Sequence, residues 1–369
     1  MKFTNIVKYN LPYTMVKSYF VYVNEMNRYE QLVFDKKGGA FSNVEHPNEE
    51  DELYVIIIGE SNNREHMGLY GYYRQTNPLL KKISTELVLY KDVISPHANT
   101  ISSLSKVLTL GNYEMPEMKF KGLIFQLFNK AEFETYWLSN QEPIGTHETG
   151  ITKLTKSADK RFFVNSKSNR KKSPFDDMIF TPLAKILQEK ANKKFIIIQL
   201  LGSHVDYANR YPPDYNKFTE TPLTDFKNKT AYTQINAYDN SILYTDFIIS
   251  QVIEKVKNTK IKSYVLYFSD HGEDVYKASN KAFHAEDYKS KYMYEIPFLL
   301  WRSEKFINNT NNLVFDINRK YMTDDLIYSI ADLSNIKFDE FVAKKSLFNN
   351  KFEYRKRIIL DSLNYDTFF

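Results

Sequence analysis

Residues 54–61 read YVIIIGES, a short apolar run that ends in polar side chains. Two further runs, Phe195–Leu201 and Tyr264–Phe268, have the same form, and polar residues follow each of them. Continuous apolar runs of this length, separated by helix-length segments, are typical of parallel strands buried on both faces of a sheet. They predict an α/β fold, a three-layer α/β/α sandwich with a mainly parallel central sheet. Helices are expected at Ile101–Leu110, Ile179–Ala191, Ala231–Val256 and Asp324–Ile330.

The pattern changes near residue 51, which predicts an N-terminal arm at residues 1–50 and one large domain at residues 51–369. The arm has apolar residues spaced loosely, as on an amphipathic helix. It either packs on the domain or links it to a membrane domain that the sequence lacks. No apolar run approaches the roughly 20 residues of a membrane-spanning helix, and Met1–Asn5 does not have the pattern of a secretory signal. The lysine-rich stretch Ser157–Ser173 is expected to be an exposed loop.

The composition excludes several classes of protein. Hydrophobic residues make up 43% of the chain, which is enough for a packed interior and excludes disorder throughout. The net charge of +5 comes from interspersed residues, so it gives little support to nucleic-acid binding and mild support to an anionic surface such as phospholipid or lipopolysaccharide. Because there is no cysteine, disulfides, thiolate metal sites and cysteine nucleophiles are excluded. Any metal must be held by histidines and carboxylates.

The polar residues after the three runs predict a metal site. The carboxyl ends of parallel strands meet at one edge of a sheet, so Glu60, Asp270 and His271 are expected to converge. Two carboxylates and one imidazole suit zinc with a position left for substrate. Adjacent residues on a strand point to opposite faces, so Asp270 and His271 can reach one metal only where the strand ends and turns. Gly272 permits such a turn.

Thr100 is the candidate nucleophile. Asn99 or Thr100 resembles a helix N-cap, because Ile101, Leu104 and Leu108 mark an apolar helical face directly after it. Amides and the positive end of the helix dipole favour phosphate at that place, and a neighbouring zinc would lower the hydroxyl pKa further. The alternative is that Thr100 only caps the helix.

Histidines supply the remaining candidates. His204 follows a predicted strand and His284 lies soon after the Asp270-His271 pair, so either could bind a second metal, contact a phosphoryl oxygen or protonate a leaving group. The other histidines are expected to be either surface residues or residues that orient the motifs: the former are His46 and His147, the latter His66 and His97.

An ordered series of motifs resembles a known family. The motifs are Gly59-Glu60-Ser61-Asn62-Asn63-Arg64-Glu65-His66-Met67-Gly68-Leu69-Tyr70-Gly71-Tyr72, Asn99-Thr100-Ile101-Ser102-Ser103-Leu104, Tyr136-Trp137-Leu138-Ser139-Asn140-Gln141, Leu201-Gly202-Ser203-His204, Tyr238-Asp239-Asn240, Phe268-Ser269-Asp270-His271-Gly272-Glu273 and Ile296-Pro297-Phe298. Over roughly residues 50–305 they are similar to the bacterial phosphoethanolamine transferases of the alkaline phosphatase and sulfatase superfamily, and the first motif most resembles the lipopolysaccharide-core subgroup.

The resemblance implies a site and a reaction. Zinc would be held by Glu60, Thr100, Asp270 and His271. Substrate would be contacted by His204, His284, Asn99 and Ser61, with a second zinc near the two histidines as an alternative. Phosphoethanolamine would pass from phosphatidylethanolamine to a lipopolysaccharide core sugar or lipid A, through a phosphoethanolamine-threonine intermediate. The protein would act at the membrane surface, on the periplasmic face of the bacterial inner membrane, without nucleic acid.

The sequence differs from the family in two respects, and two alternative functions remain open. Family members normally carry membrane helices and often disulfides, so the chain is expected to be an excised catalytic domain or a truncated natural form. The first alternative is a phosphodiesterase or phosphatase with the same site. A sulfatase is disfavoured, because Asn99-Thr100-Ile101 lacks the Cys/Ser-x-Pro-x-Arg pattern of that activity. The second alternative is a non-catalytic lipopolysaccharide-binding domain.

Overall fold

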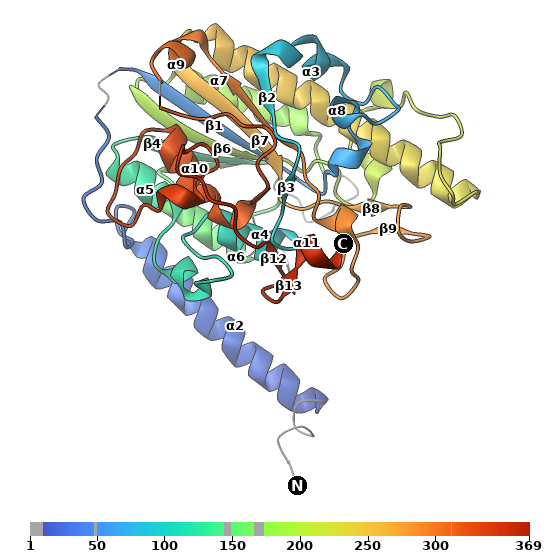
Figure 1. Cartoon of the computed structure of the whole chain (residues 1–369), viewed down its shortest axis with the longest axis horizontal. Coiled ribbons are helices and arrows are strands. Elements are labelled where there is room, and N and C mark those ends of the chain that lie inside the picture. The colour runs from blue at the N-terminus through green and yellow to red at the C-terminus, as the bar shows by residue number, and fades with distance from the viewer. Residues whose placement is uncertain (1–9, 48–49, 144–148, 166–172, 311) are drawn as a thin grey trace.

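A seven-stranded sheet forms the centre of the molecule (Figure 1). The computed structural model describes residues 10–47, 50–143, 149–165, 173–310 and 312–369. The strand order is β2-β10-β7-β1-β6-β4-β5, and β10 runs antiparallel to both of its neighbours while the other pairs are parallel. The strands are β1 (Glu52–Gly59), β2 (Leu87–Leu89), β4 (Glu134–Ser139), β5 (Lys160–Phe163), β6 (Lys193–Gln199), β7 (Lys262–Ser269) and β10 (Phe298–Arg302).

Helices cover both faces of this sheet. Every residue of β1 is buried, and its side chains alternate between two apolar clusters. Tyr54 and Ile56 pack on one face with α4 (Thr100–Val107), α5 (Ile124–Lys130), α6 (Thr149–Leu154) and α10 (Leu326–Leu333). Val55 and Ile57 pack on the other face with α3 (Pro78–Lys82), α7 (Phe180–Gln188) and α8 (Lys229–Asn258). The predicted α/β/α sandwich with a mainly parallel sheet is therefore confirmed.

Four strands of the sheet were not predicted: β2, β4, β5 and β10. β4 is almost fully buried, but its consecutive apolar residues are only 136–138. β10 is a short run of five residues that ends in Arg302, and β2 and β5, at the sheet edges, have no fully buried residue. The expectation that Ser157–Ser173 is an exposed loop is wrong at its start, where Ser157 is buried and β5 adds the last strand. The later part of that stretch, residues 166–172, lies outside the described residues.

Smaller pairings fold the remaining segments onto the body. β3 (Val93–Ile94) pairs with β11 (Tyr321–Met322), β8 (Asp274–Val275) pairs with β9 (Ala282–Phe283), and β12 (Ile358–Ile359) pairs with β13 (Leu363–Asn364). The helices α9 (Glu304–Asn308) and α11 (Tyr365–Phe368) complete the C-terminal part.

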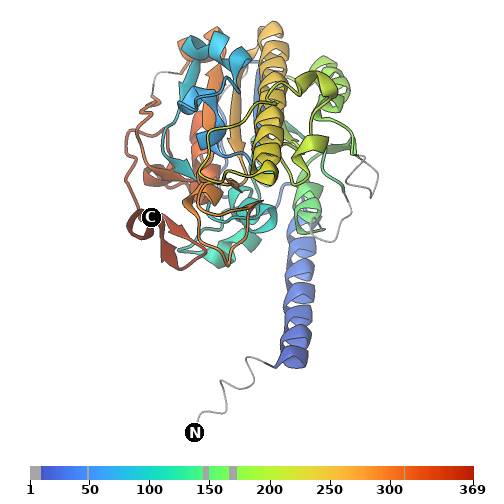
Figure 2. The same cartoon turned by 90° about the vertical axis from the view of Figure 1, so that its right-hand side faces the viewer.

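The N-terminal arm contains one long helix, α2 (Leu11–Phe34), which starts at the Asn10 cap. Its second half packs on the body through the buried side chains of Met26, Tyr29 and Val33. Its first half extends away from the body (Figures 1 and 2) and exposes several large apolar side chains. The second half of the helix therefore packs on the body, and the link to a membrane domain stays a prediction. Among the described residues, no helix is both long and apolar enough to span a membrane.

Candidate active site

The parallel register of β1 and β7 brings the predicted ligands together. Gly59 is opposite Ser269, so Glu60 and Asp270 are the next residues along neighbouring strands. The Asp270 amide still donates to the Gly59 carbonyl at 3.1 Å. Beyond this point the chain turns, with Ser61 at a φ of 59°. At Gly272 an added Cβ would lie 2.2 Å from the Tyr292 carbonyl oxygen, so only glycine allows this turn to pack.

Three of the four predicted metal ligands form a compact buried group. The group consists of Glu60, Asp270 and His271, and is called the ligand group below. Its candidate ligand atoms all lie within 4.8 Å of one another. His271 Nε2 is 3.3 Å from Glu60 Oε1 and 3.6 Å from Asp270 Oδ2. These side chains are at most 3% exposed, so the group is shielded from bulk water.

Thr100 is the first residue of α4 and reaches the same group. Its hydroxyl donates to Glu60 Oε2 at 3.1 Å. Asn99 is the N-cap, and its side-chain oxygen accepts from the Ser102 amide at 2.9 Å. The hydroxyl of Ser103 donates to the Asp270 carbonyl at 2.6 Å, which ties α4 directly to the turn that carries the ligands. The helix N-terminus, the hydroxyl and the carboxylates therefore meet at one point.

The donor set fits a divalent cation. His271 Nδ1 lies 2.8 Å from the Gly272 carbonyl oxygen, which can only accept, so Nδ1 carries the proton and Nε2 presents its lone pair. Within the part of the chain that the structure describes, Asp270 Oδ2 and His271 Nε2 have no hydrogen-bond partner. Buried polar atoms are normally paired, so two unpaired atoms that face Glu60 indicate a ligand between them. One imidazole and two carboxylates suit zinc.

Electrostatics support the same conclusion. Burial, and next the carboxylate of Glu60, raise the pKa of Asp270 to about 7. Burial also opposes ionisation of Glu60, but the neighbouring His271 keeps the pKa of Glu60 below its ordinary value. Burial lowers the pKa of His271, but Asp270 and Glu60 outweigh it and raise that pKa to about 10. Without a cation the two buried carboxylates compete for one imidazolium, whereas a divalent cation would let both ionise.

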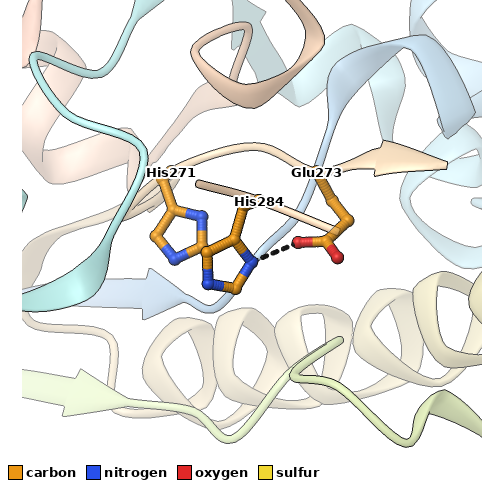
Figure 3. Close-up of side chains that lie close together, drawn as sticks. All are labelled: His271, Glu273 and His284. Carbon is orange, nitrogen blue, oxygen red and sulfur yellow. Dashed lines mark hydrogen bonds and ion pairs between the residues drawn. The ribbon is translucent and has the colours of Figure 1, made fainter. Parts of the chain in front are cut away.

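Both remaining histidines lie beside this group. The ring of His284 is 4.3 Å from the ring of His271, centroid to centroid (Figure 3). His204 follows Gly202, whose φ is 51° and where an added Cβ would lie 2.9 Å from backbone atoms of Glu60. This close approach holds the end of β6 against the end of β1, and the charge of His204 is among those that lower the pKa of Glu60.

The two other residues predicted to contact substrate make hydrogen bonds within the protein. The hydroxyl of the fully buried Ser61 donates to Glu60 Oε1 at 2.8 Å. Asn99 Nδ2 donates to Glu286 Oε1 at 2.6 Å. Their roles toward substrate stay predictions.

Three residues of the site were not singled out from the sequence. Gln141 Nε2 lies 3.3 Å from Glu60 Oε2, and its position after β4, the strand beside β6, could have indicated it. Glu273 directly follows the ligand turn and accepts from His284. Glu286 accepts from Asn99 and has no comparable sequence pattern.

The expectations for the other histidines had mixed outcomes. The side chain of His46 is 1% exposed, and its Nε2 lies 2.5 Å from Glu52 Oε2, so the surface prediction was wrong. The buried carboxylate at the start of β1 requires this polar partner. His66 and His97 each pair with a carboxylate, at 2.7 Å from Asp239 and from Glu286 respectively, which agrees with an orienting role. His147 lies outside the described residues.

Comparisons with known proteins place the chain in context. The family described as Sulfatase matches residues 52–336. The chain is 30% identical to phosphoethanolamine transferase EptC of Escherichia coli O18:K1:H7 over 96% of its own length, and it spans 65% of that relative.

The chain is also similar to solved structures, including one of the EptC domain. The zinc complex of the C-terminal periplasmic domain of EptC from Escherichia coli has a TM-score of 0.82 and 31% identity, covering 88% of this chain and 93% of that one. A protein of the alkaline phosphatase superfamily from Vibrio parahaemolyticus shares the fold alone, with a TM-score of 0.54 and 12% identity over 84% of this chain and 74% of that one.

Proposed function

The chain belongs to the sulfatase family, and because its similar relatives include the phosphoethanolamine transferase EptC, we propose that it is the zinc-dependent catalytic domain of a phosphoethanolamine transferase. The observation that carries the proposal is the hydroxyl of Thr100, at the N-terminus of α4 and 3.1 Å from Glu60 in the buried ligand group. The proposed catalytic unit is residues 51–369, with residues 1–50 as an arm.

Zinc is the proposed metal, with Glu60, Asp270, His271 and the Thr100 hydroxyl as ligands. The solved zinc complex of the related EptC domain supports this choice, and so do the unpaired ligand atoms of Asp270 and His271. When bound, zinc lowers the pKa of a coordinated hydroxyl and offsets negative charge on phosphoryl oxygens.

The proposed reaction has two displacements at phosphorus. The Thr100 hydroxyl gives its proton to His284 or His204 beside the ligand group, and Thr100 Oγ1 forms a bond to the phosphorus of phosphatidylethanolamine while the bond from phosphorus to the glycerol oxygen breaks. The same histidine then passes that proton to the glycerol oxygen, so that diacylglycerol leaves as the neutral alcohol. An acceptor oxygen then takes the phosphoethanolamine from Thr100, and the threonine regains its proton. The amides at the start of α4 stabilise charge on the phosphoryl oxygens.

The proposed donor is phosphatidylethanolamine, and the proposed acceptor is lipopolysaccharide, at a core sugar or at lipid A. The names of the relatives support a phosphoethanolamine donor. The periplasmic origin of the related EptC domain supports action on the periplasmic face of the inner membrane, at the membrane surface.

Peptide mass spectrometry tests the proposal. Zinc-loaded protein is incubated with vesicles that contain phosphatidylethanolamine, and the peptide with Thr100 is examined for a phosphoethanolamine adduct. Wild type and Thr100→Ser should both carry the adduct, because both supply a hydroxyl, and Thr100→Ala should carry none. Release of free phosphoethanolamine without any adduct in a rapid-quench series would support a hydrolase instead. No turnover of the lipid by zinc-replete protein would contradict the proposal.

A further inference from the structure

Glu273 is a buried carboxylate beside the ligand group for which the reaction above has no role. It is 1% exposed. Its Oε2 lies 2.6 Å from His284 Nδ1, and its Oε1 accepts from the Tyr207 hydroxyl at 2.5 Å. Figure 3 shows the carboxylate of Glu273 directed at His284, whose ring lies beside that of His271.

The local fold explains why these two side chains meet. β8 pairs antiparallel with β9, and Asp274 is opposite Phe283. The next residues outward along the same register are Glu273 and His284, so they face each other across the end of the hairpin. The backbone of Glu273 is fixed as well, because its carbonyl oxygen accepts from Asn63 Nδ2 at 3.0 Å.

The same atoms could suggest a second metal site, since ligand atoms of His271, Glu273 and His284 lie within 4.8 Å of one another. The hydrogen bonds argue against it. Each oxygen of Glu273 already has a short hydrogen bond, and Nδ1 of His271 is held by the Gly272 carbonyl. A metal at this place would have to displace those contacts.

We propose that Glu273 is a positioning residue that fixes the ring orientation and the tautomer of His284, with Tyr207 holding the carboxylate from its other side. An ionised carboxylate only accepts, so Nδ1 of His284 must carry hydrogen and Nε2 is the atom offered to the substrate. The proposal rests on the proposed transferase function for its catalytic consequence. Its structural content, the tautomer, does not depend on that function.

The test compares Glu273→Ala with Glu273→Gln in zinc-loaded protein. The amide oxygen of glutamine can accept from His284 Nδ1 while its NH2 group donates to Tyr207, so the Gln variant keeps the arrangement that alanine removes. Glu273→Ala should lower kcat for phosphoethanolamine transfer by about tenfold or more, with zinc content unchanged and KM little altered. Glu273→Gln should recover most of this loss, and Tyr207→Phe should have a smaller effect than Glu273→Ala.

Nitrogen-15 NMR of histidine-labelled protein gives a readout that does not require activity, with the His284 signals assigned by their loss in His284→Asn. Wild type and Glu273→Gln should show His284 as the Nδ1–H tautomer, and Glu273→Ala should shift it toward Nε2–H. An unchanged tautomer in Glu273→Ala, or loss of zinc from that variant, would overturn the proposal. If wild type transfers no phosphoethanolamine, the proposed function fails, while the tautomer still decides the role of Glu273.

Discussion

Asp270, one of the proposed zinc ligands, has a buried carboxylate whose ionisation is unfavourable without a cation. Its Oδ1 accepts from the amides of Ser61 and His271, whereas Oδ2 has no hydrogen-bond partner in the described structure. Burial and the nearby Glu60 raise the pKa of Asp270 to about 7. In the absence of metal, ionisation of this carboxylate therefore opposes folding at neutral pH.

We expect Asp270→Asn to be more stable than wild type in EDTA, because the amide keeps both backbone contacts and removes a buried charge. The melting temperature at pH 8 should rise by roughly 2–4 °C. Addition of zinc should raise the melting temperature of wild type but not that of the variant. Calorimetry with and without zinc checks both statements. A variant that melts lower than wild type in EDTA would contradict this account.

Asp246 in α8 is a second buried carboxylate, and it lies away from the ligand group. It accepts from the amides of Leu79 and Leu80 at the start of α3, at 2.9 Å and 3.0 Å. Burial raises the pKa of Asp246 to about 7. The pKa of Asp246 is higher in the folded protein than in the unfolded chain. Its contribution to the free energy of unfolding is therefore complete below about pH 4 and is lost as the pH rises through 7.

Asp246→Asn should therefore gain stability relative to wild type as the pH rises from 5 to 8, by about 2 kcal/mol. Loss of one acceptor from the α3 amides adds a constant cost that does not change with pH. Urea unfolding of both proteins in EDTA at several pH values measures the difference. The same difference at pH 5 and at pH 8 would show that this carboxylate does not titrate in that range.

At the scale of elements, the segment after β9 contacts both the ligand group and the N-terminus of α4. It carries His284 beside the ligand group, and two residues later it carries Glu286. Glu286 Oε1 accepts from Asn99 Nδ2 at 2.6 Å and from His97 Nδ1 at 2.7 Å. One loop thereby orients a histidine and holds the N-cap of α4, on which Thr100 lies.

Glu286→Ala should lower kcat about three- to tenfold, because loss of about 1 kcal/mol of hydrogen bonding lets the cap of α4 move. The melting temperature should change little, since the Glu286 side chain is 37% exposed. Asp287→Ala removes the same charge from the adjacent exposed residue and should leave kcat unchanged. Equal effects of the two substitutions would indicate a general electrostatic effect in place of a specific contact.

The elements that the sequence predicts well are those whose signal is local. β1, β6 and β7 are continuous apolar runs, and the proposed ligands directly follow β1 and β7, so the same stretches of sequence predicted both the strands and the candidate site. β10 was missed because its five residues give neither alternation nor length, and its antiparallel direction depends on packing against β7. The contact of Glu273 with Tyr207 joins residues 66 positions apart through tertiary packing alone, and no local pattern could indicate it.

At the scale of the whole molecule, Arg357 connects the C-terminal segment to the body. It donates to Asp92, before β3, at 2.6 Å, and to Asp366 in α11 at 2.5 Å. Burial opposes ionisation of Asp366, but Arg357 and Tyr354 lower its pKa to about 2. Because the pKa of Asp366 is lower in the folded protein than in the unfolded chain, its ionised carboxylate stabilises the folded protein above about pH 4. This stabilisation is lost as the pH falls toward 2.

Arg357→Met should reduce the free energy of unfolding by about 1–2 kcal/mol at pH 7, because it removes two charge-assisted contacts. The difference from wild type should narrow as the pH falls from 5 to 2. Hydrogen exchange should become faster in residues 358–369 of the variant. Lys356→Met, at the neighbouring exposed position, is the control and should alter neither property. Unchanged exchange in the Arg357 variant would show that the segment is held by its apolar contacts.

The extended first half of α2 also makes the orientation of this helix measurable by energy transfer between two dyes. A helix of 24 residues is about 36 Å long, so a dye near Leu11 would lie far from one at the exposed Lys121 on the body. Since the sequence has no cysteine, thiols introduced at those two positions would be the only sites for maleimide dyes. Energy transfer between donor and acceptor would then report whether α2 keeps its angle or swings toward the body when lipid vesicles are added.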